Sequence, residues 1–286
     1  MEQPHTLTLP SLLQSPAFVR FGIAIDMAPE WRWLALLAVA LWPTWWWMAQ
    51  RMVDGSDDPL GALALAALGV LLWQHRLRLR AAPRLGFQVA ALAGAVLTTA
   101  LHTQLPGLLV ALVGLLSLAA GLLAFLPAQV ATVPVLGLSV LSLPLLASLQ
   151  FYAGFPLRVV TAEASSWLLS LAHTVERSGS SLMVDGQLII VDAPCSGVQM
   201  AWLGYFTACA VALLVGHNNR SFLLRLPIVS VLVLVGNVLR NTVLVGFQAA
   251  GKPMPAWGHE AVGLTVLAVV CAGIAWAMAH KPRTNN

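Results

Sequence analysis

Long apolar runs alternate with short polar loops along almost the whole chain. A helix of about 20 apolar residues crosses the hydrocarbon core of a bilayer, so each long run predicts a membrane span. Between residues 85 and 151 the chain is almost continuously apolar, which leaves the span boundaries in that stretch indistinct. We expect eight spans, at about 31–49, 59–74, 85–101, 106–126, 130–151, 196–216, 226–246 and 260–279.

Residues 152–194 depart from this pattern. Apolar residues at spacings of three and four over 161–175 predict an amphipathic helix on the membrane surface or against the bundle. The dipeptide Asp185-Gly186, between β-prone residues 182–184 and 187–191, predicts a short β-hairpin. A hairpin inside the hydrocarbon would leave backbone groups unpaired, so we expect it outside the membrane or covered by protein.

The composition excludes a soluble domain. Hydrophobic residues make up 59% of the 286 residues and charged residues only 9%, whereas soluble domains carry about 25% charged residues. The net charge of +4 would also suit a nucleic-acid partner. However, the arginines cluster in short loops between apolar runs, as in membrane proteins. We therefore expect an all-α polytopic membrane protein in contact with a lipid bilayer and not with nucleic acid.

The positive loops predict an orientation in the membrane. The loop at 75–84 holds four arginines, the loop at 217–225 holds two, and two more cations lie in the tail at 281–286. With eight spans these segments fall on one side, which the positive-inside rule makes cytoplasmic.

The N-terminal segment has four prolines and no long apolar run, so it does not resemble a signal peptide. We divide the chain into a cytoplasmic or interfacial segment (1–30), five N-terminal spans (31–151), a C-terminal core (152–280) and a cytoplasmic tail (281–286).

Three residues of reactive type reach the outer face of this topology at similar depth. Cys195 lies where the extracytoplasmic segment enters the sixth span, and His259 lies at the outer start of the eighth. Arg240 is about 14 residues, or roughly 21 Å of helix, into the seventh span, which places it in the outer half of the membrane. No other Cys, Arg and His share a side and a depth in this way, so these three form the candidate active site.

Each of the three suits a role in acyl transfer. The thiolate of Cys is the nucleophile, and a helix N-terminus or a cation lowers the thiol pKa. Pro194 fits the first turn of a helix, so Cys195 should lie near the positive end of the sixth span. Arg240 can stabilise the thiolate or the charge that develops on a carbonyl, and His259 can act as base and then acid. We predict that both converge on the sulfur within hydrogen-bond or one-water reach.

The other two cysteines, Cys209 and Cys271, lie inside apolar runs, where Cys behaves as a small hydrophobe. The chain has no CxxC and no spacing typical of metal ligands. We therefore expect neither a disulfide framework, nor a metal, nor a cofactor. His102 and His173 are rival bases on the same predicted side, but no motif surrounds them.

Polar neighbours of the three candidates form a supporting set, and a purely structural role stays open for each. Asn237 lies one helical turn before Arg240 and can orient it, whereas Ser196 is expected to cap a helix. Asp192 and Glu260 can orient His259 or restrain the thiol pKa, or can simply be solvated. Arg158 contacts either substrate or lipid headgroups. The supporting residues are Asn237, Ser196, Gly197, Asp192, Arg158 and Glu260.

Three motifs give the chain a family resemblance. Ala-Pro-Cys-Ser-Gly at 193–197, Asn-Val-Leu-Arg-Asn at 237–241 and Gly-His-Glu at 258–260, each at the outer end of a span, resemble the exosortase/archaeosortase family, as does Phe-Pro-Leu-Arg at 155–158. The resemblance is specific over about 150–280 and looser before that. It implies that Cys195, Arg240 and His259 are catalytic.

The resemblance also implies a substrate and a place in the cell. Members of the family are thought to cleave a C-terminal sorting signal on exported proteins: a short motif such as Pro-Glu-Pro, a transmembrane helix and a basic tail. This would make the chain an inner-membrane cysteine protease or transpeptidase with its site facing the periplasm, linked in bacteria to exopolysaccharide and biofilm matrix. The subfamily, the recognition motif and the acceptor nucleophile remain open.

Two functions of other classes remain as alternatives. One is a transporter or polysaccharide-export component, although transporters usually have inverted repeats and broken helices at the membrane midplane, and no repeat is visible here. The other is a non-catalytic scaffold of a secretion complex, in which Arg240 and His259 would matter only for protein abundance.

Overall fold

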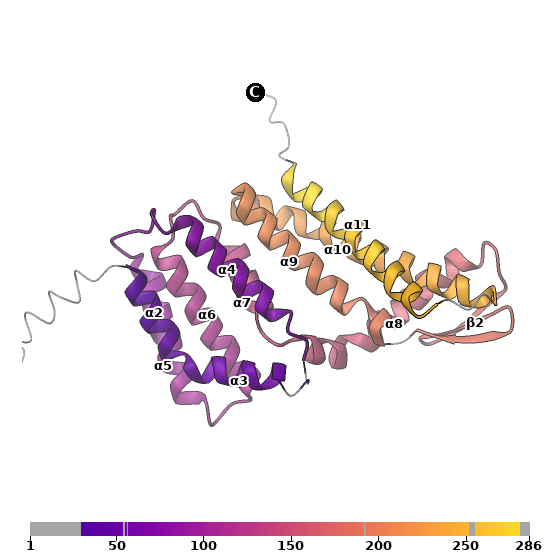
Figure 1. Cartoon of the computed structure of the whole chain (residues 1–286), viewed down its shortest axis with the longest axis horizontal. Coiled ribbons are helices and arrows are strands. Elements are labelled where there is room, and N and C mark those ends of the chain that lie inside the picture. Colours follow the sequence, from indigo (N-terminus) through magenta and orange to yellow (C-terminus); the bar gives the residue numbers. More distant parts are fainter. Residues whose placement is uncertain (1–29, 54, 56, 192, 252–254, 281–286) are drawn as a thin grey trace, which may run out of the picture.

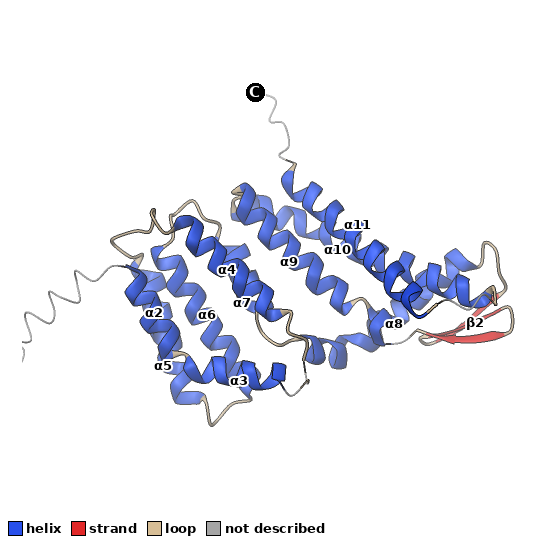
Figure 2. Cartoon of the chain, in the orientation of Figure 1, coloured by secondary structure: helices blue, strands red, loops and turns tan. Residues whose placement is uncertain are grey.

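The computed structural model describes residues 30–53, 55, 57–191, 193–251 and 255–280. Within them the chain is mostly helical, with one small antiparallel sheet near one end (Figures 1 and 2). The predicted segments 1–29 and 281–286, and Asp192, lie outside the described residues. The elements are α2 (Glu30–Ala40), α3 (Trp42–Val53), α4 (Gly61–His75), α5 (Leu85–Leu101), α6 (Gly107–Phe125), α7 (Thr132–Leu141), α8 (Leu146–Leu169), β1 (Val175–Ser178), β2 (Ser181–Val184), β3 (Gln187–Ile190), η2 (Ala193–Ser196), α9 (Val198–Val215), α10 (Asn219–Ala249) and α11 (Ala256–Ala279).

Several of these helices are long and apolar enough to cross a membrane. Among the described residues, four meet this condition singly, namely α6, α9, α10 and most of α11, and the bent pair of α7 and α8 makes a fifth if it is one span. Helices α4 and α5 are apolar but shorter. The chain is therefore a multi-pass integral membrane protein, and the predicted count of eight spans is not confirmed.

The first predicted span, 31–49, is two helices rather than one. Helix α2 ends at Ala40 and α3 begins at Trp42, with Leu41 in the turn between them. Pro43 explains the break, because proline has no N–H to donate and its ring clashes with the carbonyl four residues before it. The indole Nε1 of Trp45 donates to the carbonyl of Ala38 at 2.7 Å and so satisfies a backbone group near the break.

The predicted division between a fifth span at 130–151 and a separate amphipathic helix at 161–175 is wrong. Helix α7 stops at Leu141, the chain turns, and α8 then runs without interruption from Leu146 to Leu169, at 94° to α7. Pro144 lies in the turn and disfavours helix in the residue before it. Pro156 lies inside α8 and does not end it.

The sheet is a three-stranded meander in the order β1-β2-β3. Asp185 and Gly186 join β2 to β3 with φ angles of 48° and 83°, as the type I′ hairpin turn requires. Strand β1 was not predicted. Leu182 and Val184 are fully buried in one cluster with residues of α8 and α10, so protein covers this face of the hairpin. The side of the membrane on which it lies stays a prediction.

Helices α9, α10 and α11 pack against one another and carry the C-terminal half of the molecule, with the sheet at one end of them (Figure 1). At the other end, Arg225 near the start of α10 donates to the carbonyls of Ala277 and His280 at the end of α11. His217, just after α9, is hydrogen-bonded to the carbonyl of Met278. Because these ends meet, the starts of α9 and α11 and the end of α10 come together at the sheet end.

Candidate active site

Cys195 lies in a short 3-10 turn, η2, directly before the N-terminus of α9. Gly197 separates the two helical segments because its φ of +86° is left-handed, a conformation that only glycine adopts without strain. Cys195 is 7% exposed. It belongs to the buried cluster that includes Val191, after β3, and Leu244 of α10. The sheet therefore packs against the turn that carries the cysteine.

Asn237 of α10 holds the backbone of this turn. Its Nδ2 donates to the carbonyl of Cys195 and to Oγ1 of Thr161 in α8, each at 3.0 Å. A Cβ on residue 197 would come within 2.8 Å of Cγ and Nδ2 of Asn237, so the close approach also requires Gly197. The sequence suggested that Asn237 orients Arg240; the contacts found instead connect it to the cysteine backbone.

Ser196 makes two contacts that fix the same turn from α8 and α9. Its Oγ donates to Oε1 of Gln150 at 2.7 Å and accepts from the backbone N–H of Val198 at 3.3 Å. Gly197 rather than Ser196 is the N-cap residue of α9, and no side chain caps this helix, so the capping role predicted for Ser196 is not confirmed. Gln150 was not among the predicted residues.

Arg240 and His259 line one cavity of about 530 Å³ between the start of α9, the C-terminal half of α10 and the start of α11. Arg240 is half-buried, and its guanidinium lies against Gly263, where an added Cβ would come within 3.2 Å of Nε. His259 and Glu260 are exposed in the first turn of α11. The full lining is Gln199, Met200, Leu203, Arg240, His259, Glu260, Gly263, Leu264 and Leu267.

Cys195 is not among the residues that line this cavity, but it is connected to the cavity wall along the chain and through α10. Gln199 and Met200 of the cavity wall follow Cys195 by one helical turn. Asn237, which bonds the Cys195 carbonyl, lies one turn before Arg240 on α10. The structure thus gathers the elements that carry Cys195, Arg240 and His259 at the sheet end of the bundle.

The remaining predicted residues lie elsewhere. Arg158 of α8 is half-buried with its guanidinium 5.8 Å from the ring of Phe155, and it does not line the cavity. The rival bases have other partners: His102 contacts the carbonyl of Thr99, and His173 pairs with Asp185 at 2.6 Å. Neither lines the cavity.

Comparison with known proteins identifies the family. The model of the transmembrane exosortase family matches residues 45–276, which is most of the chain and includes Cys195, Arg240 and His259. No curated protein and no solved structure matches. The chain belongs to the transmembrane exosortase family.

Proposed function

We propose that this chain is a membrane-embedded cysteine endopeptidase or transpeptidase. Its substrates would be exported proteins with a C-terminal sorting signal, cleaved at the outer face of the inner membrane. The observation that carries the proposal is the cavity that Arg240 and His259 share beside the Cys195 turn. Family membership supports the same chemistry.

Cys195 would act as the nucleophile. His259 takes the thiol proton, and the thiolate sulfur attacks the scissile carbonyl carbon, which forms a tetrahedral intermediate. The guanidinium of Arg240 stabilises the negative charge on the carbonyl oxygen. The carbon–nitrogen bond then breaks, His259 returns the proton to the leaving amine, and a thioester to Cys195 remains.

The second half of the reaction releases the enzyme. Water or an amine attacks the thioester, His259 accepts the proton of that nucleophile, and the Cys195 thiolate leaves. Water gives proteolysis, and an amine gives transpeptidation.

The shape of the cavity supports a substrate anchored in the membrane. One part is polar, with Arg240, His259 and Glu260, and another is apolar, with Leu264 and Leu267 one and two turns further along α11. A sorting signal joins a short motif to an apolar helix, so the motif would lie in the polar part while its helix follows the apolar one. With the arginine-rich loops in the cytoplasm, this end of the bundle faces the periplasm, where matrix proteins linked to exopolysaccharide would be sorted.

The test is processing of a reporter that ends in a short motif, an apolar helix and a basic tail, expressed in a strain that lacks the chromosomal copy of the enzyme. Cys195→Ala and Cys195→Ser should accumulate uncleaved reporter at a normal membrane level of the enzyme. Cys209→Ala and Cys271→Ala are matched controls, because these thiols lie within α9 and α11, and both should process normally. Normal processing by Cys195→Ala would contradict the proposal.

A further inference from the structure

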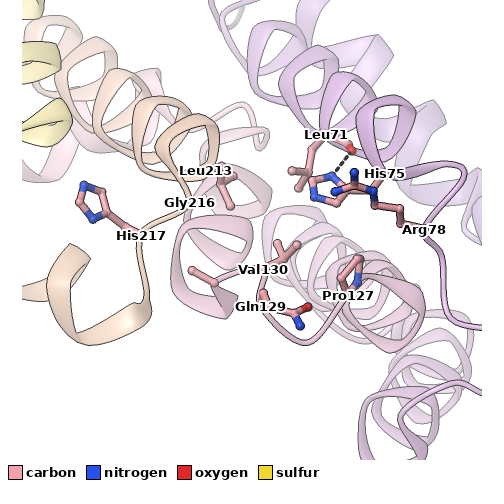
Figure 3. Close-up of a pocket in the computed structure, with 10 residues that line it drawn as sticks. Leu71, His75, Arg78, Pro127, Gln129, Val130, Leu213, Gly216 and His217 are labelled. Atoms are coloured by element: carbon pink, nitrogen blue, oxygen red, sulfur yellow. Dashed lines mark hydrogen bonds between the residues drawn. The ribbon is translucent and has the colours of Figure 1, made fainter. Parts of the chain in front are cut away.

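A second cavity, of about 500 Å³, lies at the end of the bundle remote from Cys195. Gly216 and His217, which follow the last residue of α9, lie in its wall, whereas Cys195 precedes the first. The 18 residues of α9 separate the two ends by about 27 Å at 1.5 Å per residue. The other walls come from the end of α4 and the loop between α6 and α7 (Figure 3). The lining is Leu71, His75, Arg78, Pro127, Gln129, Val130, Ala131, Leu213, Gly216 and His217.

The polar side chains of this cavity are basic or neutral, and none of the described residues that line it is a carboxylate. Nδ1 of His75 contacts the carbonyl of Leu71 at 3.0 Å, which makes Nδ1 the donor and leaves Nε2 for a ligand. Gln129 brings an amide from the α6–α7 loop. The ring of His217 does not contribute to the site, because it is hydrogen-bonded to Met278 and Ser221 and points away from His75 in Figure 3.

Arg78 differs from the other arginines of its loop. Arg76 donates to the carbonyl of Trp73 and stacks on its indole at 3.9 Å. Arg80 donates to Ala82, and Arg84 donates to the carbonyl of Leu123. Within the described part of the chain, Arg78 alone of the four makes no such bond, and its side chain is exposed at the cavity. An exposed guanidinium beside a cavity without carboxylates is suited to a bound anion.

We propose that this cavity binds a phosphate group through Arg78, His75 and Gln129. A guanidinium matches phosphate with paired N–H donors, and the imidazole Nε2 adds a donor when protonated. The apolar part of the lining favours an anionic lipid over free phosphate, because buried Leu71 and half-buried Val130 and Leu213 can contact the apolar part of a lipid. Basic pockets between helices at the cytoplasmic surface are typical sites for such headgroups.

A ligand here would join three parts of the chain that are far apart in sequence. It would connect the end of α4 to the α6–α7 loop and the end of α9, and it would stabilise the folded protein in proportion to its occupancy. Phosphate binding at this site does not depend on the reaction at Cys195, so failure of this proposal and failure of the proposed function are separate outcomes.

The experiment titrates phosphatidylglycerol, phosphatidylcholine or inorganic phosphate into the purified full-length protein in neutral detergent and follows its thermal unfolding. Phosphatidylglycerol should raise the midpoint of the wild type, and phosphatidylcholine should not. Arg78→Gln should weaken the apparent affinity for phosphatidylglycerol about tenfold, as expected for loss of one charged hydrogen-bonding partner. Arg76→Gln is the matched control, since it removes the same charge from the same loop outside the cavity, and it should change the affinity little.

The outcomes separate the alternatives. A rise with inorganic phosphate that Arg78→Gln abolishes would support the phosphate site and assign it to a soluble ligand. Equal losses in Arg76→Gln and Arg78→Gln would overturn the proposal in favour of general attraction between the loop and anionic surfaces. The absence of any rise with phosphatidylglycerol or phosphate in the wild type would also overturn it.

Discussion

Replacement of Gly197 by alanine tests how the cysteine turn is held. The residue has a left-handed backbone, with φ of +86°, which costs a residue with a Cβ about 1–2 kcal/mol. The new Cβ would also come within 2.8 Å of Asn237, whose side chain is 3% exposed and has no room to move freely. Displacement of Asn237 would weaken its bonds to Cys195 and Thr161, each of which contributes about 0.5–1.5 kcal/mol.

The combined destabilisation of Gly197→Ala is therefore about 2–5 kcal/mol, a large part of the stability of a typical domain. The assay is thermal unfolding in detergent, together with reporter processing normalised to enzyme abundance. Processing per molecule should fall further than abundance, since the Cys195 carbonyl loses its anchor on α10.

Gly179→Ala is the matched control. Gly179, in the turn between β1 and β2, also has a left-handed backbone, with φ of +62°, but an added Cβ there meets nothing within 4 Å. It should therefore show only the backbone cost, with normal processing per molecule. If Gly197→Ala and Gly179→Ala behave alike in both assays, the contact with Asn237 does not position the cysteine.

Three further predictions use the same assays. Arg240→Ala should reduce processing at least a hundredfold at normal abundance, since loss of one donor to a developing oxyanion costs about 10²–10³ in rate. Arg240→Lys should recover part of the lost activity. If both variants process the reporter as fast as the wild type, Arg240 does not stabilise the oxyanion. Thr161→Val should destabilise the protein by about 1 kcal/mol, because Nδ2 of Asn237 loses one of its acceptors; unchanged unfolding would show that this bond is not needed. Hydrogen bonds from His173 and the Thr174 N–H hold the pKa of Asp185 below its usual range. The ionised carboxylate therefore stabilises the fold above the usual pKa of aspartate, and this contribution is lost as the pH falls through the lowered value. The midpoint of thermal unfolding should drop less between pH 7 and pH 3 in Asp185→Asn than in the wild type.

Local signals in the sequence predicted the local features of the fold. Asp185-Gly186 specified the turn because few other residue pairs adopt left-handed φ at both positions. The apolar run at 85–101 matches α5 because polar residues or proline flank it on both sides. The charge and depth of Arg240 and His259 placed them at one end of the bundle, where both line one cavity.

Features that depend on distant contacts could not be predicted in this way. Gln150 and Thr161 looked like ordinary polar residues of a membrane helix, and their partners lie 46 and 76 residues away. Proline usually ends or kinks a helix, but α8 continues through Pro156. The carboxylate of Asp57, 90 residues before Ala147, accepts the backbone N–H of Ala147 at the start of α8. These contacts exist only once the helices have packed together.

The most direct test of the proposed chemistry is a search for the acyl-enzyme. Purified enzyme is mixed with a sorting-signal substrate, quenched in acid within a single turnover, digested and measured by mass spectrometry. We expect the acyl fragment of the substrate on the peptide that contains Cys195, as a thioester that hydroxylamine removes and that Cys195→Ala does not form. Full cleavage of the substrate with no adduct on Cys195, or with the adduct on another residue, would contradict the role of Cys195 as the nucleophile.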